Sequence, residues 1–135
     1  MELTLHGTFL EVDDHEAALA FYRDTLGFEV RKDVSFGSGR WVTLGTKAQP
    51  ELGIVLVSVG FGRPPEDAQM LKELLAKGSL AGLVFETDDV DALFEKVAAS
   101  GAEVLQEPMD QPFGVRDCGF RDPAGNQMRF NQPKS

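Results

Sequence analysis

Two stretches of the chain repeat one pattern, GTFLEVDDHEAALAFYRDTLGFEV at residues 7–30 and GLVFETDDVDALFEKVAASGAEV at residues 82–104. Each begins with a glycine and an alternating strand, continues with an Asp-Asp pair and a helical segment, and ends with a glycine and a second strand. One register aligns all of these features, with a single-residue shift at the second glycine. A register shared by so many features indicates an internal duplication.

Each copy has the local chemistry of a capped helix. The Asp-Asp pairs at residues 13–14 and 88–89 precede the helical segments, where a carboxylate accepts hydrogen bonds from the first free amides. Gly27 and Gly101 stand where a helix commonly ends in a left-handed residue. Within the first helix, we expect Phe21 to pack in the core and Tyr22 to lie toward the rim.

Three further strand candidates follow each helix, at residues 28–36, 40–44 and 54–59 and at residues 103–107, 115–120 and 127–131. The pattern predicts an α+β fold of two tandem βαβββ modules, each a curled mixed sheet with one helix on its back. We expect a single domain, with module one at 1–60, a linker with a short helix at 61–79 and module two at 80–135. The two sheets would form a shared trough.

The composition excludes several classes of partner. The net charge of −9 argues against nucleic acid, because binding to it depends on clustered cations. The charge is compatible with a cationic small ligand, although solubility alone explains it. The chain has no run of about 18 apolar residues that would predict a membrane span, and its N-terminus alternates like a strand rather than a signal peptide. The single cysteine, Cys118, excludes an internal disulfide, so a reducing cytoplasm is the simplest compartment.

The segments VDDHEAALAFYRDTLGFEV (12–30) and QPFGVRDCGFRDPAGNQMRF (111–130) resemble the vicinal oxygen chelate superfamily. That superfamily includes glyoxalase, the bleomycin-resistance proteins and the extradiol dioxygenases, and the later segment looks particularly like its counterpart in bleomycin-resistance proteins. With the duplicated plan, the resemblance covers nearly the whole chain and implies a homodimer. It specifies fold more strongly than chemistry, because this fold carries several unrelated activities.

The resemblance also implies four metal-ligand positions, where enzymes of the family usually carry His, Gln or Glu. In this sequence the four positions read Gly7, about Leu56, Gly82 and Arg129. None offers an electron pair suited to a divalent cation, and a guanidinium would repel one. We therefore expect the enzyme fold without the enzyme metal, and no cofactor.

Seven residues are expected to line the trough and bind a ligand: Gly7, Phe9, Glu11, Gly82, Glu86, Phe113 and Arg129. Glu11 and Glu86 share the strand face of their glycines, and their charge suggests a cationic or hydrogen-bond-donating ligand. An internal ion pair with Arg129 is the competing explanation, since a buried cation needs a partner. Otherwise Arg129 would anchor a ligand anion. The two phenylalanines would stack on an aromatic ligand, or pack in the core or at a dimer interface.

The remaining candidates receive structural interpretations. Strand alternation should turn His6 away from the trough, and His15 in the first helical turn is expected on the surface. Trp41 is expected to pack in the core or at an interface. Cys118 has no histidine nearby in sequence to activate it and is expected to be a packing residue. Three arginines should be rim or solvated charges, each a candidate partner of Asp117: Arg40, Arg116 and Arg121.

The function favoured by these observations is metal-independent binding of a small cationic or aromatic molecule, either an antibiotic that is sequestered or a metabolite. The alternative is a glyoxalase-like lyase, isomerase or dioxygenase. That would need an atypical metal site, such as His6 with a glutamate, or metal-free catalysis with Glu11 or Glu86 as general base. A regulatory or partner subunit without a ligand would instead have a trough filled by its own side chains.

Overall fold

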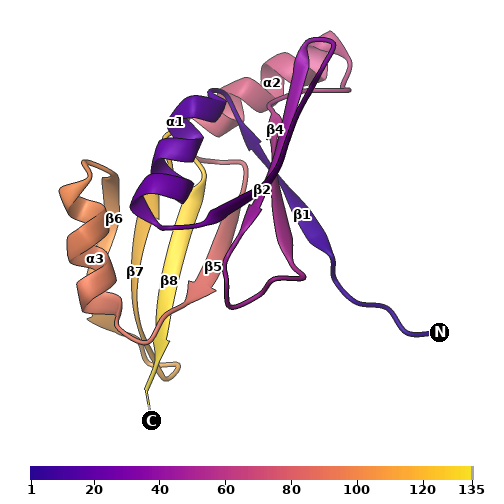
Figure 1. Ribbon diagram of the computed structural model, residues 1–135. Coiled ribbons are helices and arrows are strands. Elements are labelled where there is room, and N and C mark those ends of the chain that lie inside the picture. The colour runs from indigo at the N-terminus through magenta and orange to yellow at the C-terminus, as the bar shows by residue number, and fades with distance from the viewer. Residues whose placement is uncertain (135) are drawn as a thin grey trace.

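The computed structural model describes residues 1–134 and contains two four-stranded sheets (Figure 1). The first has the strand order β1-β4-β3-β2, with β1 (Gly7–Val12), β2 (Glu29–Phe36), β3 (Gly39–Gly45) and β4 (Gly53–Ser58). The second has the order β5-β8-β7-β6, with β5 (Gly82–Glu86), β6 (Glu103–Asp110), β7 (Val115–Arg121) and β8 (Gln127–Pro133). The strand β1 pairs in parallel with β4, and β5 pairs in parallel with β8. All other neighbouring strands are antiparallel. The α+β fold with two tandem βαβββ modules is therefore confirmed.

The helices follow the predicted plan, with one local departure. In the first module α1 (His15–Leu19) continues directly into a π-helical turn, η1 (Ala20–Thr25). The second module contains α3 (Val90–Ala99), and α2 (Pro65–Ala76) connects the two sheets along the chain. Among residues 1–134, no helix is both long and apolar enough to cross a bilayer.

The helix ends have the chemistry that the sequence predicts. The side chain of Asp14 accepts hydrogen bonds from two backbone amides at the start of α1, and Asp89 accepts one at the start of α3. Gly27 and Gly101 both adopt left-handed conformations, with φ of 80° and 90°. The duplication is thus visible in local geometry as well as in topology.

One continuous core fills the space between the helices and the facing sides of both sheets. Its largest fully buried side chains come from both modules and include Leu10, Leu44 and Leu56 together with Phe120, Met128 and Phe130. Figure 1 shows why the modules share a core: α1 lies between the two sheets, while α3 lies against the second. The helix α1 is therefore covered on two sides.

Two sequence expectations about the first helix are wrong for this reason. Tyr22 is fully buried rather than at the rim, and Phe21 beside it is buried as well. His15 is buried rather than on the surface, and its Nε2 lies 3.0 Å from the backbone oxygen of Leu56 on β4. Helical periodicity alone predicts one buried face, whereas a helix between two sheets has two.

A buried polar network joins the modules at the turn between β7 and β8. The hydroxyl of Tyr22 donates to Oδ2 of Asp122 at 2.6 Å. Oδ1 of Asp122 accepts hydrogen bonds from three successive backbone amides of the turn, at residues 124–126. Nδ2 of Asn126 donates to the backbone oxygen of Glu11 at 2.9 Å. The turn is thus fixed to both the helix and the first strand of the other module.

This network should make the protein less stable at alkaline pH. Burial, the negative charge of Asp122 and the hydrogen bond to it raise the pKa of Tyr22 well above its usual range. The unfolded chain therefore loses the Tyr22 proton near pH 10 while the folded chain keeps it, so the free energy of unfolding should fall as pH rises above about 10. Tyr22 is the only tyrosine. Tyrosinate absorbance should accordingly appear at higher pH in the native than in the urea-unfolded protein, and coincident titrations would contradict this expectation.

Candidate functional site

The face of each sheet that points away from the core, called here its open face, carries the predicted site residues. On β1 the buried side chains of Leu10 and Val12 alternate with Phe9, which is 61% exposed, and with Gly7 and Glu11. The three predicted residues of β1 therefore share the first open face, as strand alternation requires. The second open face similarly includes Gly82 and Glu86 on β5, which alternate with the half-buried Leu83 and Phe85. It also includes Arg129 on β8, whose two neighbours in sequence are buried.

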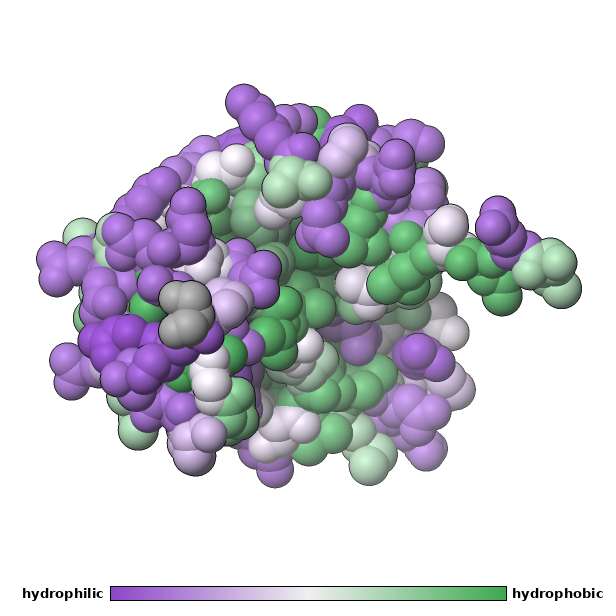
Figure 2. Space-filling view, turned by 90° about the horizontal axis from the view of Figure 1, so that it is seen from below, coloured by the Kyte–Doolittle hydropathy of each residue, from purple (hydrophilic) through white to green (hydrophobic). Residues whose placement is uncertain are grey.

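The first open face is aromatic. The rings of Phe9 and Phe36 lie 5.3 and 5.6 Å from that of Trp41, and Phe61 lies 5.5 Å from Phe36. Trp41 is half-buried among these rings and is not part of the core, so of the two expected placements only packing at an interface stays a prediction. Its indole N–H is buried and has no acceptor within residues 1–134. Figure 2 shows hydrophobic side chains gathered in a hollow across the middle of the molecule's lower side.

Glu11, on the same face, is already engaged within the chain. Its Oε1 accepts a hydrogen bond from the backbone amide of Gly60 at 2.9 Å. The residue paired with it across the sheet is Val57 on β4, and Phe9 is paired with Val55. This face therefore places one carboxylate at the edge of an apolar and aromatic surface.

The second open face contains a polar network centred on Arg129. Its Nη2 donates to Oδ2 of Asp117 at 3.1 Å and to Oε1 of Gln106 at 2.7 Å. Oδ1 of Asp117 in turn accepts from the side-chain amides of Gln106 at 2.7 Å and Gln111 at 3.0 Å. The predicted alternative of an ion pair between Arg129 and a trough glutamate is thus wrong within the chain, because the partner is Asp117.

The electrostatics of Asp117 follow from this network. Burial alone would raise the pKa of this carboxyl group, which is 3% exposed. The hydrogen bonds from Gln111 and Gln106, with the charge of Arg129, outweigh burial and hold the pKa below its usual value. Asp117 is therefore ionised at neutral pH, and it forms a charge-neutral pair with the arginine.

The positions that carry metal ligands in related enzymes do not fit a divalent metal here. A side-chain carbon at Gly7 would lie 2.9 Å from the backbone oxygen of Gly53, and one at Gly82 would lie 2.6 Å from that of Gln127. Neither strand therefore has room for a ligating side chain without a backbone shift. Leu56 points into the core, its neighbours on the open face are valines, and Arg129 is a cation. Residues 1–134 contain no cluster of three or more His, Cys, Asp or Glu side chains that could hold a metal ion.

The other predicted residues lie outside these two networks. Phe113 is 68% exposed in the turn between β6 and β7, and Glu86 is exposed at the end of β5. His6 is exposed and precedes β1. Cys118 is fully buried, and desolvation raises the pKa of its thiol to about 11, so its interpretation as a packing residue is confirmed.

The three arginines considered as partners of Asp117 all pair elsewhere. Arg40 contacts Glu16 and Asp33, Arg116 contacts Asp91 and Asp110, and Arg121 contacts Glu103. These pairs lie at the surface or are partly exposed, as expected for rim charges. Such pairs typically contribute little stability, because solvent screens them.

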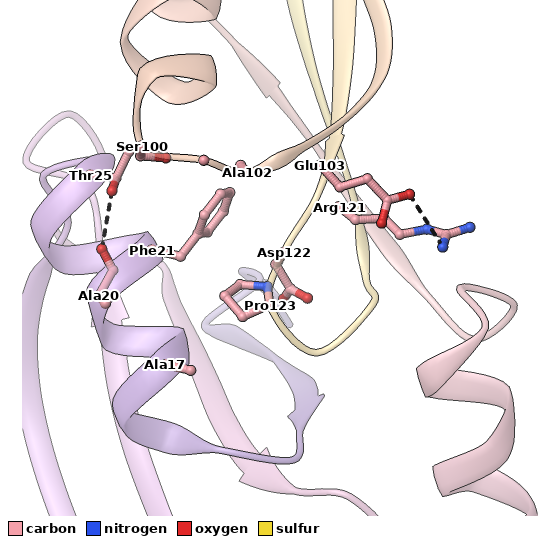
Figure 3. Close-up of a pocket in the computed structure, with 11 residues that line it drawn as sticks. Ala17, Ala20, Phe21, Thr25, Ser100, Ala102, Glu103, Arg121, Asp122 and Pro123 are labelled. Carbon is pink, nitrogen blue, oxygen red and sulfur yellow. Dashed lines mark hydrogen bonds and ion pairs between the residues drawn. The ribbon is translucent and has the colours of Figure 1, made fainter.

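A separate hollow of about 340 Å³ lies on the other side of the molecule's sheets, between α1 and the second module. It is lined mainly by small residues, including Ala17, Ala20 and Ala102, and Figure 3 shows the ring of Phe21 pointing toward Ala102. The dashed contact between Glu103 and Arg121 lies to one side of it. None of the seven predicted trough residues lines this hollow.

Two βαβββ modules, each with one sheet and one open face, define a fold shared by a large group of binding proteins and enzymes. The chain belongs to the glyoxalase/bleomycin resistance protein/dioxygenase superfamily, whose family model matches residues 4–130. The resemblance seen in the sequence is therefore confirmed.

Three similar proteins show how far the likeness extends. The crystal structure of UcmS2 is 36% identical, with a TM-score of 0.87, and the match covers 97% of this chain and 98% of that one. TnmS3, described as an antibiotic binding protein from Streptomyces sp. CB03234, is 32% identical with a TM-score of 0.76 and 98% coverage of both chains. YurT of Bacillus subtilis (strain 168) is 26% identical over 125 residues, covering 93% of this chain and 95% of YurT.

Proposed function

We propose that this chain is a metal-independent binding protein that sequesters a small aromatic molecule, an antibiotic or a metabolite, without transforming it. The observation that carries the proposal is the set of residues at the metal-ligand positions. Of the four positions, two are glycines without room for a side chain and one falls at the buried Leu56. The fourth, Arg129, is already paired with Asp117. The antibiotic-binding description of TnmS3 supports the same class of function.

The aromatic cluster on the first open face supplies the means of binding. Phe9 presents an exposed ring next to the half-buried Trp41, and a planar ligand stacked on such rings gains about 0.5–1.5 kcal/mol beyond simple burial. Glu11 and the net charge of −9 disfavour an anionic ligand.

The proposal includes a homodimer. The open faces leave Phe9, Val84 and Met109 exposed at 61%, 66% and 47%, and together they make apolar surface on both sheets. A second copy of the chain would cover this surface, and an open face from each copy would then form the trough. The proposed location is the cytoplasm, where the buried free thiol of Cys118 stays reduced.

The test of the proposal begins with metal content, measured by mass spectrometry on untagged protein after dialysis against Ni²⁺, Zn²⁺, Fe²⁺ and Mn²⁺. Sub-stoichiometric metal throughout is the expected result, and sedimentation of the same samples should give the mass of a dimer. One tightly held metal per chain would contradict the proposal. It would favour instead the lyase, isomerase or dioxygenase alternative, with His6 and the glutamates as ligands.

Binding can be followed through Trp41, the only tryptophan. In a screen of cationic antibiotics and aromatic metabolites, a ligand should quench Trp41 fluorescence and raise the melting temperature. Phe9→Ala should weaken the affinity of such a ligand by about 2- to 12-fold, the equivalent of one stacking contact.

Met70→Ala is the matched control for this experiment. Met70 is 60% exposed on α2 and belongs to neither sheet, so its truncation should leave the affinity unchanged. Equal losses of affinity in the two variants would show that the ligand does not bind on the first open face.

A further inference from the structure

The side chain of Arg129 lies against the second open face instead of extending into solvent. Its neighbours across the sheet are Val84 on β5 and Gly119 on β7. A side-chain carbon at Gly119 would come within 2.9 Å of Nη1 of Arg129, so the glycine leaves the space that the guanidinium occupies. The side chain of Arg129 is 32% exposed and can therefore be reached by a ligand.

The protein holds the guanidinium through only one of its nitrogens. Both hydrogen bonds of Arg129 to residues 1–134 are donated by Nη2, to Asp117 and Gln106. A guanidinium has five N–H donors in a fixed plane, so the N–H groups of Nη1 and Nε remain available. Because Asp117 is itself fixed by two glutamines, the donors are held in place before a ligand arrives.

The charge around these donors selects the kind of acceptor. The ionised carboxylate of Asp117 neutralises Arg129 at a distance of 3.1 Å, and Glu86 on the adjacent strand adds a negative charge to the same face. A ligand anion would therefore gain little from the guanidinium and would be repelled by its surroundings. A neutral oxygen accepts the same hydrogen bonds without this repulsion.

The surface next to the donors is apolar. Val84 stands directly opposite Arg129 in the sheet and is 66% exposed, while Met109 is paired with Asp117 and is 47% exposed. Leu105 on β6 is also exposed, and its Cβ lies beside Gly119. Apolar walls around a few convergent polar groups are typical of small-molecule sites.

We propose that Arg129 donates hydrogen bonds from Nη1 and Nε to a neutral carbonyl oxygen on an apolar ring ligand, with Asp117 and Gln106 as positioning residues. The proposal rests on the binding function proposed above and specifies the chemistry of the atom that is recognised. It replaces the sequence-based hypothesis of a bound anion. The guanidinium then stands at a position where related enzymes carry a metal ligand, and it offers the ligand oxygen a cationic donor in place of a metal.

Three probes of matched shape test this assignment: 9-fluorenone, which has the carbonyl; fluorene, which lacks it; and 9-fluorenecarboxylate, which is an anion. Affinities are measured by quenching of Trp41, and the Nε–H resonance of Arg129 is followed in ¹H–¹⁵N spectra. We expect 9-fluorenone to bind at least about tenfold more tightly than either other probe, because the hydrogen bond is to a charged donor. The Nε–H resonance should shift with 9-fluorenone and not with fluorene.

Two variants separate this role from a structural one. Arg129→Lys keeps the charge and loses the planar donors, and Gly119→Ala displaces the guanidinium, so both should reduce the preference for 9-fluorenone to near unity with fluorene affinity unchanged. Arg63→Lys, at an exposed arginine between β4 and α2, should keep the full preference.

The outcomes distinguish this inference from the function on which it rests. Equal binding of 9-fluorenone and fluorene would overturn the role of Arg129 and leave ligand binding intact. Tighter binding of 9-fluorenecarboxylate would show an anion site and overturn the neutral acceptor. Failure of all three probes to bind, by fluorescence and by spectral shift, would overturn both proposals.

Discussion

Asp122→Ala is expected to lower the free energy of unfolding by at least about 4 kcal/mol, enough to unfold a marginally stable domain. The carboxylate accepts five hydrogen bonds, from three backbone amides of its own turn, from the side chain of Asn126 and from the hydroxyl of Tyr22. Asp122 is 4% exposed and Tyr22 fully buried, so water replaces few of these contacts. Each buried donor left without an acceptor costs about 1–3 kcal/mol.

The measurement is urea denaturation at pH 7, followed by far-ultraviolet circular dichroism, and Tyr22→Phe is the matched comparison. That variant removes a single hydrogen bond to the same carboxylate and should cost about 1.5–3 kcal/mol. If Asp122→Ala cost no more than Tyr22→Phe, the turn would not depend on the carboxylate. The order of the two effects therefore tests whether Asp122 organises the contact between modules or only accepts the hydrogen bond from Tyr22.

Much of this architecture follows from local patterns. The duplicated stretch at residues 7–30 and 82–104 predicts the first strand, the helix and the second strand of each module, and the Asp-Asp and glycine positions predict the helix ends. These features depend on a few neighbouring residues, so sequence alone determines them. The placement of Gly7, Phe9 and Glu11 on one face is likewise a consequence of strand alternation.

The long-range contacts of the first helix could not be found in this way. Tyr22 is buried against the turn of the second module that carries Asp122, and His15 is buried against β4 of its own module. Their partners, Asp122 and the backbone of Leu56, lie 100 and 41 residues away along the chain. No local pattern encodes the distance between residues that far apart.

The partner of Arg129 could have been predicted in part, because the sequence of the hairpin indicates which residues face Arg129. The turn at residues 122–126 fixes the register of the hairpin, in which Gly119 pairs with Arg129 and Asp117 with Asn131. Counting outward from the turn therefore places Asp117 on the same face as Arg129 and diagonally next to it. Gln106 could not be placed by counting, since irregularities in β6 interrupt its register with β7.

Gly125→Ala is expected to lower the free energy of unfolding by about 3–5 kcal/mol, through backbone strain and steric overlap together. Gly125 adopts φ of 122°, a conformation that residues with a side chain rarely adopt. A Cβ there would also overlap the backbone oxygen of Leu75 at the end of α2. That oxygen cannot easily move away, because it accepts a hydrogen bond from the amide of Gly78 at 3.0 Å and Leu75 is 1% exposed.

Gly101→Ala isolates the two causes, since Gly101 has φ of 90° but nothing within 4 Å of an added Cβ. It should therefore lose about 1 kcal/mol from strain alone. Urea midpoints of both variants, measured with Trp41 fluorescence, give the comparison directly. Similar losses of unfolding free energy would mean that α2 shifts to accommodate the added methyl group. Its last turn would then not be held rigidly against the turn between β7 and β8. A much larger loss for Gly125→Ala would show that the connection between the modules and the turn at residues 122–126 pack as one rigid contact, on the same hairpin that carries Asp117 and Arg129.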